Sequence, residues 1–251
     1  MSVPAAPTDQ NQPHEQPLHL DWPDCLNARD VGGLPTADGG RIREKALVRT
    51  DSHSKLTPEG IAAVHAYGVS RIIDLRRNRE CELAPSPFAA DPLYRNIEVQ
   101  NPADPDHQTL DLADIYLTML DLRPKLFTAA VAAIADAPPG AVVVHCAGGK
   151  DRTGVVVGMA LHVAGVDEET IAADYALTEA RLAEESAAFL ERVSDLELRE
   201  NYRRLLPTPP ANMLKVLGHL DERYGGVAPY LEAGGMMPAQ HAVLRNRLRE
   251  A

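Results

Sequence analysis

The chain has 251 residues, 45% of them hydrophobic, which is enough to bury a substantial core. Its 25 Lys and Arg against 36 Asp and Glu give a formal net charge of −11, and this excess of negative charge disfavours nucleic acid as a partner. Three cysteines, Cys25, Cys81 and Cys146, stand far apart without a C-x-x-C pair, so neither a disulfide framework nor a zinc site is expected.

Two further absences bear on location. The first twenty residues lack a basic segment followed by an apolar core, so they do not read as a secretory signal, and no apolar run reaches the length of a membrane span. We therefore expect a cytoplasmic protein with no integral membrane segment. Secretion that does not depend on a signal peptide is left open.

The predicted elements follow in chain order. Residues 1–17, which include a stretch rich in Pro and Gln, are expected to be a disordered lead-in, and residues 18–251 a single domain. Strands are expected at residues 46–51, 69–75 and 141–146. Helices are expected at residues 57–68, 115–136 (broken before Pro124), 153–165, 167–182, 182–206, 213–224 and 238–248. Strands that alternate with helices predict an α/β fold, with a mainly parallel central sheet covered by helices on both faces.

One segment, AVVVHCAGGKDRTGVVVG at residues 141–158, carries the chemistry. A strand that ends in a glycine-rich loop and continues as a helix aims backbone N–H groups and the positive helix end at one point, which is a site for a phosphate-like anion. Cys146 enters this site where a thiolate is stabilised. The planar guanidinium of Arg152 can donate hydrogen bonds to two phosphoryl oxygens. The predicted phosphate-binding residues are Ala147, Gly148, Gly149, Lys150, Asp151 and Arg152.

Other interpretations of this loop are weaker. The nucleotide-binding pattern G-x-x-x-x-G-K-[ST] fails because Asp151, not a hydroxyl residue, follows Lys150. An inert buried thiol is the common fate of a free cysteine, and we assign that role to Cys25 and Cys81, with reversible oxidation together with the nucleophile as the alternative. Lys150 is expected to add a cation for phosphate.

The segment H-C-x-x-G-x-x-R from His145 to Arg152 resembles the signature of the cysteine-dependent protein-tyrosine phosphatases. The longer form HCxxGKDRTG resembles their atypical bacterial branch, which includes secreted mycobacterial and listerial phosphatases. Similar stretches continue along the chain: NARDVGGL, LVRTDSHSKLTPEG, RIIDLRRNRE, DYALTEARL and YGGVAPYLEAGGM. At Ala147-Gly148 the sequence departs from related loops, which often carry a larger residue followed by alanine.

The resemblance implies a reaction. In this family the cysteine forms a phosphocysteine, a carboxylic acid protonates the leaving alcohol, and water releases inorganic phosphate, with no metal or other cofactor. His145 and Thr153 are then expected to support the thiolate and its loop. The expected substrate is a phosphorylated protein, phosphotyrosine foremost. The alternatives are a phosphoserine/threonine or phosphoinositide phosphatase, including dual specificity, a rhodanese-like sulfurtransferase and a non-catalytic phosphate-binding adaptor.

Several aspartates are candidates for the general acid. The tetrapeptide at residues 21–24 contains the WPD motif of receptor-like tyrosine phosphatases, but it lies too far before Cys146, and we assign it to N-terminal packing. Asp151 is ranked first, because similar loops in some lipid phosphatases use an aspartate there. Asp74, at the end of a predicted strand, is the alternative. The last candidates, on a Pro-rich loop and the helix start after it, are Asp104, Asp106, Asp111 and Asp114.

Two further features of the sequence bear on the site. Arg76 is expected at the rim of the site, because ligands bind at the carboxyl ends of strands in open α/β sheets. Residues 182–206 are amphipathic and dense in charge, which is typical of ordinary packing on the domain. The family resemblance suggests instead that they form a helical, lid-like insertion over the site.

Overall fold

A computed structural model describes residues 17–100 and 110–250 of the chain, and the predicted lead-in lies outside these ranges except for Pro17. Its sheet has six strands in the order β1-β2-β3-β6-β4-β5. These strands are β1 (Leu18–His19), β2 (Arg29–Asp30), β3 (Leu47–Thr50), β4 (Val69–Asp74), β5 (Tyr94–Asn96) and β6 (Ala141–His145). The predicted mainly parallel sheet is confirmed: β3, β6, β4 and β5 run parallel, and β1 and β2 add an antiparallel edge.

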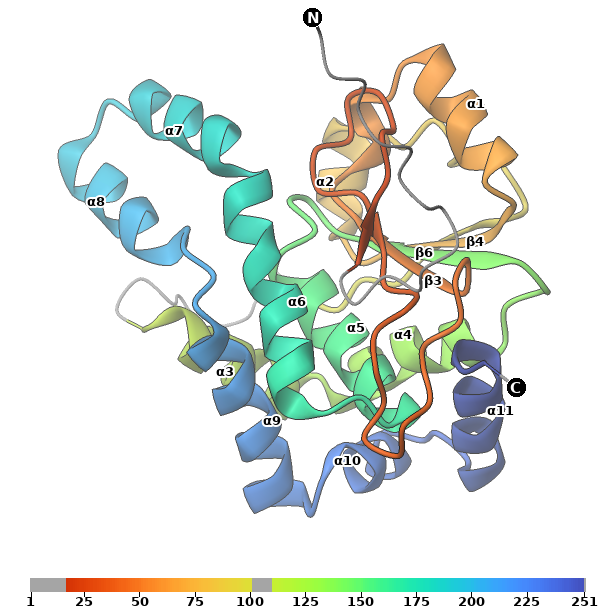
Figure 1. Ribbon diagram of the computed structural model, residues 1–251. Helices are drawn as coiled ribbons and strands as arrows, with labels where there is room; N and C mark the ends of the chain where they lie inside the picture. Colours follow the sequence, from red (N-terminus) through yellow and green to blue (C-terminus); the bar gives the residue numbers. More distant parts are fainter. Residues whose placement is uncertain (1–16, 101–109, 251) are drawn as a thin grey trace, which may run out of the picture.

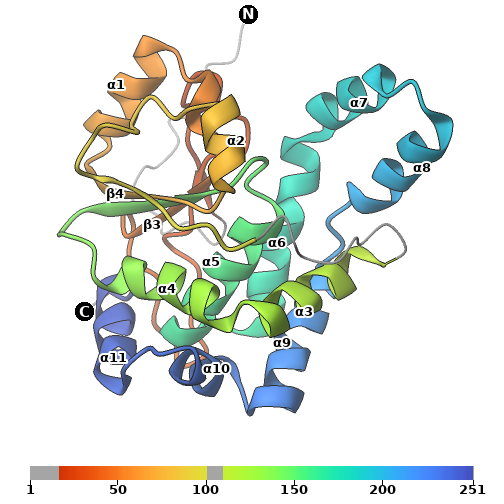
Figure 2. The ribbon, with the colours of Figure 1, turned by 180° about the vertical axis from the view of Figure 1, so that it is seen from behind.

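The helices cover both faces of this sheet, as predicted. In Figures 1 and 2, α1 (Pro58–Ala66) and α2 (Asn78–Leu83) lie on one side of the strands, and the other helices of the main body lie on the opposite side. These are α3 (Leu112–Leu122), α4 (Pro124–Ala135), α5 (Asp151–Ala164), α6 (Glu168–Arg181), α9 (Pro210–Tyr224), α10 (Val227–Ala233) and α11 (Pro238–Leu248). The sheet is therefore the middle layer of three.

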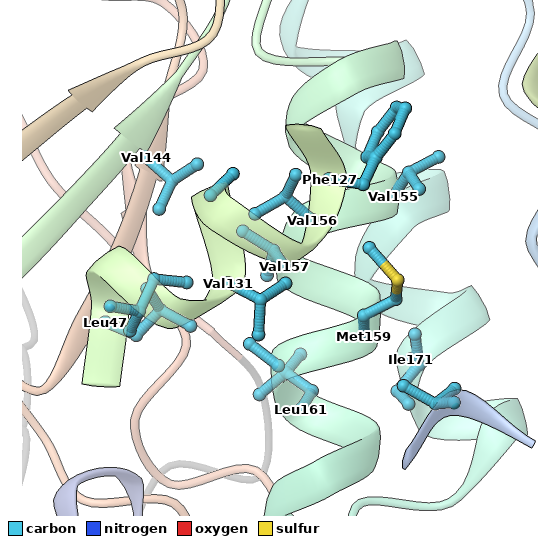
Figure 3. Close-up of a cluster of buried hydrophobic side chains, with 14 of the residues drawn as sticks. Leu47, Phe127, Val131, Val144, Val155, Val156, Val157, Met159, Leu161 and Ile171 are labelled. Carbon is cyan, nitrogen blue, oxygen red and sulfur yellow. The ribbon is translucent and has the colours of Figure 1, made fainter. Parts of the chain in front are cut away.

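Successive side chains of the central strands point to opposite faces of the sheet, so the core has two parts. Val143 of β6 faces the α1 side, where it is buried with Val64 and Trp22. Val142 and Val144 face the other way and join a larger cluster with α4 and α5, whose valines and Phe127 appear in Figure 3. Trp22 of the WPD segment packs at 5.8 Å from the ring of Tyr67, in agreement with the packing role that we assigned to it.

Helix α5 is rich in β-branched residues and still helical. Each valine costs up to about 0.7 kcal/mol relative to alanine in a helix, whereas complete burial of a valine gains about 1.5–3 kcal/mol. Val155, Val156 and Val157 are almost completely buried between the sheet and the surrounding helices. Tertiary packing therefore decides the conformation, as the sequence predicted.

The helix boundaries follow local signals. The Thr57 side chain accepts a hydrogen bond from the Gly60 amide at the start of α1, and Asp167 caps α6 at Thr170 in the same way. Gly165 ends α5 in the left-handed conformation, with φ of 93°. The helix itself begins at Asp151, two residues before the predicted start. The sequence analysis missed the short elements β1, β2, β5, α2, η1 (His53–Lys55) and α10.

The predicted helical insertion is present, but as two helices rather than one. Residues 183–205 form α7 (Ala183–Arg192) and α8 (Leu196–Leu205), with a break at residues 193–195. Figures 1 and 2 show this pair extending away from the body after α6 and returning to α9 beside α3. Neither helix has a completely buried residue. Phe189 and Tyr202 hold the pair together, with ring centroids 4.9 Å apart.

Candidate active site

The site lies where the central strands end. The register aligns Thr50 of β3, His145 of β6 and Asp74 of β4 in one row across the sheet. Cys146 follows directly and is only 1% exposed, and residues 147–150 connect it to the N-terminus of α5. The predicted strand–loop–helix is therefore at the carboxyl edge of a parallel sheet, which is the usual place for ligands in such folds.

The loop carbonyls are held from outside. The Ala147 oxygen accepts from the Ser52 amide at 2.8 Å. The side-chain amide of Asn27 donates to the oxygens of Gly148 and Gly149 at 3.0 and 3.2 Å. Arg49 adds a bond to the Gly149 oxygen at 2.9 Å. Because the N–H of a peptide unit points opposite to its C=O, outward carbonyls leave the loop amides directed inward, as an anion site requires.

These outer partners belong to a buried charge network. Asp174 of α6 accepts from Arg29 Nε at 2.8 Å and from Arg49, and all three side chains are almost completely buried. Burial would raise the pKa of the Asp174 carboxyl, but the two guanidinium groups hold it below its usual range. Arg29 also donates to the side-chain oxygen of Asn27. The network therefore fixes the two side chains that hold the loop.

Sequence reasoning missed Asn27, Arg49 and Asp174 as parts of the site. The usable signal was a charged residue inside a strand whose other residues are uncharged and buried, since Arg49 lies between Val48 and Thr50 in β3. A completely buried arginine needs a carboxylate partner. The identity of that partner, 125 residues away in the chain, had no local signature.

Arg152 is oriented by Glu80, another residue that the sequence analysis did not single out. Its two terminal nitrogens donate to the two Glu80 oxygens at 2.7 and 3.0 Å. Burial would raise the pKa of Glu80, but the bonds from Arg152 lower it to about 2. Burial would lower the pKa of the Arg152 guanidinium, and the nearby Cys146 and Glu80 raise it instead. The Arg152 guanidinium is therefore charged, held in one orientation and close to Cys146.

Lys150 differs from the prediction. Its Nζ donates to the carbonyl oxygens of Leu205 and Leu206, at 2.6 and 3.2 Å, where α8 ends. The last carbonyls of a helix lack partners within the helix and attract a cation. In this structure Lys150 therefore ties the loop to the α7–α8 pair, rather than extending a charge toward the site of an anion.

The two candidate acids have different surroundings. Asp151 lies at the first position of α5 with its side chain 38% exposed. Its Oδ1 accepts a hydrogen bond from Tyr116 and lies 3.4 Å from Lys150 Nζ. Asp74 is completely buried and accepts from Arg76 at 2.7 Å and from the Tyr94 hydroxyl at 2.9 Å. Asp151 therefore keeps access to the space outside the loop, whereas Asp74 is enclosed by donors.

Burial would raise the pKa of Asp74, but His145 and Arg76 hold it well below its usual range. Of the remaining acid candidates, Asp104 and Asp106 lie outside the described residues. Asp111 is within 3.4 Å of Arg204, and Asp114 forms an ion pair with Lys215.

The predicted position of Arg76 at the substrate rim is wrong in this structure. The residue is 2% exposed, and its guanidinium binds Asp74 and the Ala84 oxygen, the latter at 2.8 Å. A buried carboxylate at the end of β4 requires a paired cation, and Arg76, two residues further on, provides it. Arg76 thus acts within the fold beneath the loop.

His145 and Thr153, the residues expected to support the loop, are both completely buried. The His145 Nδ1 atom lies 3.1 Å from the Cys146 carbonyl oxygen. The ring of His145 stacks on the ring of His53, with centroids 4.5 Å apart. Burial lowers the pKa of the His145 ring, and the nearby Asp74 carboxylate opposes this shift. Thr153 is completely buried, and within residues 17–100 and 110–250 its hydroxyl has no hydrogen-bond partner. The hydroxyl is thus free to donate to a group in the loop.

The other two cysteines are held by carboxylates. Cys25 is buried and donates to Asp51 Oδ1 at 3.0 Å, and burial together with this charge raises the pKa of its thiol. Cys81 is half-buried and donates to Asp74 Oδ2 at 3.6 Å, with its pKa also raised by burial. Protonated thiols are poor nucleophiles, which favours the structural role that we assigned to them.

A cavity of about 820 Å³ opens beside the loop. Ala147, Gly148 and residues 150–152 form its floor. Its walls are mostly apolar and come from α3, α7, α8 and the segments that join the last two to the body: Leu112, Ile115, Met119, Leu182, Ala183, Ala187, Phe189, Leu190, Leu205, Leu206 and Pro207. A phosphate on the loop would therefore carry its organic group into an apolar space.

Within residues 17–100 and 110–250, no group of three or more His, Cys, Asp or Glu side chains is placed to hold a metal ion. In the same part of the chain, no helix is both long and apolar enough to cross a membrane.

Comparison with known proteins gives one consistent result. The profile of the tyrosine phosphatase family matches residues 20–250. A tyrosine-protein phosphatase from Nostoc commune is 29% identical, over 86% of this chain and 79% of its own length. The triple specificity protein phosphatase PtpB from Mycobacterium tuberculosis is 26% identical, over 86% of this chain and 94% of its own. These matches confirm the resemblance that the loop motif indicated.

Two neighbouring glycines of the loop should respond differently to substitution. Gly149 has φ of +64°, and an added Cβ would lie 2.2 Å from the Thr50 oxygen. We expect Gly149→Ala to lower the free energy of unfolding by roughly 1–3 kcal/mol and to abolish binding of inorganic phosphate. At Gly148 the nearest atom to a Cβ is Leu182 Cδ1 at 3.4 Å, so Gly148→Ala should change stability by less than about 0.5 kcal/mol. Urea unfolding and calorimetry measure both, and equal effects at the two positions would contradict this account of the loop.

Proposed function

Because the chain belongs to the tyrosine phosphatase family, we propose that it hydrolyses phosphate monoesters, phosphotyrosine foremost, through a phosphocysteine on Cys146. The observation that carries this proposal is the loop itself. Its carbonyls are bound from outside by Ser52, Asn27 and Arg49, so its amides are directed at the space in front of the cysteine. Arg152 is held beside that space by Glu80.

In the first step, the Cys146 thiolate attacks phosphorus and the bond from phosphorus to the alcohol oxygen breaks. The loop amides, the N-terminus of α5 and the Arg152 guanidinium bind the phosphoryl oxygens, on which negative charge develops. Asp151 gives its proton to the leaving oxygen. Its place at the first turn of α5, with the side chain partly exposed to the cavity, supports this role.

In the second step, water attacks the phosphocysteine and the bond from phosphorus to sulfur breaks. The Asp151 carboxylate accepts a proton from the water, which regenerates the acid for the next turnover. Inorganic phosphate leaves, and Cys146 returns to the thiolate. Protons and electron pairs balance over the cycle with no metal ion or redox cofactor.

The cavity supports the preference for phosphotyrosine. Its apolar walls suit an aromatic ring better than a polyol headgroup, because burying an inositol in them would leave hydroxyl groups without partners. Phosphoserine, phosphothreonine and phosphoinositides remain the alternatives, and the name of the mycobacterial relative gives them support. The non-catalytic adaptor is disfavoured, because Cys146, Asp151 and Arg152 all occur in one loop. The cytoplasmic location stays a prediction.

The nucleophile can be tested by one substitution. We expect Cys146→Ser to abolish turnover while inorganic phosphate still binds, because the loop amides and Arg152 remain. Cys81→Ser, which removes a thiol outside the loop, should retain turnover. The assays use phosphotyrosine, phosphoserine and phosphothreonine peptides and phosphoinositide vesicles, with and without a chelator. Appreciable activity of the serine variant, or loss of wild-type activity on chelation, would rule out the mechanism, and the best substrate identifies the class.

The acid can be tested by its dependence on the leaving group. Asp151→Asn should slow phenyl phosphate hydrolysis by about 10²–10⁴-fold and should slow an activated aryl phosphate far less, since a good leaving group needs no proton. It should also remove the basic limb of the pH profile. Asp74→Asn should slow both substrates alike, because Asp74 is enclosed by Arg76 and Tyr94. If the sensitivity appears only in Asp74→Asn, the two roles must be exchanged.

A further inference from the structure

A chain of three polar groups leads from the core to the proposed acid. The Tyr116 hydroxyl of α3 donates to Asp151 Oδ1 and lies 2.9 Å from the Tyr175 hydroxyl of α6. Both tyrosines are completely buried. Neither takes part in the reaction steps given above, so their contact with Asp151 requires a separate explanation.

The direction of these hydrogen bonds follows from counting protons. A phenol has one proton, and Tyr116 places it on Asp151 Oδ1. Tyr175 must therefore donate its own proton to the Tyr116 oxygen. Burial raises the pKa of Tyr116 well above its usual value and that of Tyr175 to about 12, so both phenols keep their protons at neutral pH.

The charged neighbour of Asp151 acts on the same oxygen. Lys150 Nζ lies 3.4 Å from Oδ1, the atom that also accepts from Tyr116. A carboxylate oxygen that is bound by donors is a poor place for a proton. The proton of the acid form therefore belongs on Oδ2, and fixing Oδ1 fixes the direction in which that proton is offered.

We infer that Tyr116 is a positioning residue, which binds Oδ1 of Asp151 so that Oδ2 carries the proton to the leaving oxygen. This inference rests on the proposed function and on Asp151 as its acid. When the proton passes to the alcohol, Tyr116 keeps its own proton and its bond to Oδ1, so no further group is charged or discharged. Water then returns a proton to Oδ2.

The packing makes this arrangement rigid. Tyr175 packs against α5 at Gly154, where an added Cβ would lie 2.9 Å from its ring. Gly154 and Asp151 are three residues apart and share a face of the helix. The two tyrosine rings meet edge to face at 88°, with centroids 6.3 Å apart. The absence of a side chain at Gly154 thus allows Tyr175 to reach Tyr116 directly beside the acid.

The test is Tyr116→Phe, which keeps the buried ring and removes the donor. We expect kcat for phenyl phosphate to fall about tenfold or more, because a misplaced acid loses much of its effect. The kcat for an activated aryl phosphate should change less than about twofold, with KM unchanged for both. The matched control is Tyr230→Phe, which removes another completely buried hydroxyl, bound to the Leu120 oxygen at 2.9 Å, and should affect both substrates alike.

Two further variants keep the test decisive. Tyr175→Phe should show the same leaving-group selectivity to a smaller degree, even if Tyr116→Phe fails to fold. In an Asp151→Asn background, Tyr116→Phe should add no further selectivity. Suppose that Asp151→Asn slows phenyl phosphate more than the activated ester but neither tyrosine variant does, or that the effects of Tyr116→Phe and Asp151→Asn simply multiply. Either result overturns the positioning role of Tyr116 and leaves Asp151 as the acid. If Asp151→Asn slows both substrates alike, the assignment of Asp151 as the acid is overturned together with the positioning role of Tyr116.

Discussion

The site depends on a buried carboxylate that binds two buried arginines. Asp174 holds Arg29 and Arg49, and Arg29 in turn binds Asn27, so that Asn27 and Arg49 can bind the loop carbonyls from outside. Breaking a buried pair of this kind typically costs about 3–5 kcal/mol, because the remaining charge has no water to solvate it. Under the proposed function, the loop amides are therefore directed toward the phosphate site before a ligand binds, and little energy is needed to reorganise the loop on binding.

Each charged group of the loop is held by a different part of the chain. Arg152 is bound by Glu80 of α2, Lys150 by the end of α8, and Asp151 by Tyr116 of α3. These contacts satisfy charges that would otherwise be costly to bury in the absence of a ligand. Two of these partners, α3 and α8, also line the apolar cavity beside the loop.

Local signals predicted much of this arrangement. The parallel sheet, the caps at Thr57 and Asp167, and the loop between β6 and α5 all follow from short-range patterns of Pro, Gly, capping residues and apolar periodicity. The short strands β1, β2 and β5 did not, because two or three residues carry too little pattern to be recognised. The break inside residues 182–206 was missed because apolar residues recur at helical spacing on both sides of it.

The roles of single side chains were harder to predict than the elements. Asn27 binds Gly148 over a separation of 121 residues, and Arg29 binds Asp174 over 145, so no window of sequence contains both partners. Arg76 and Lys150 were assigned to the ligand because cations near an anion site are expected to bind it. Both instead satisfy acceptors of the protein itself, the Asp74 carboxylate and the end of α8. Burial, which decides between these roles, depends on tertiary structure.

The central claim is that a covalent bond forms between phosphorus and the sulfur of Cys146 in the loop that these contacts hold. The direct measurement is acid quenching of the wild-type protein during turnover of an activated aryl phosphate, followed by mass spectrometry of its peptides. The account predicts a phosphoryl group on the peptide that contains Cys146, located on sulfur. A phosphoryl group on another residue, or steady release of phosphate with no modified peptide at any quench time, would contradict it.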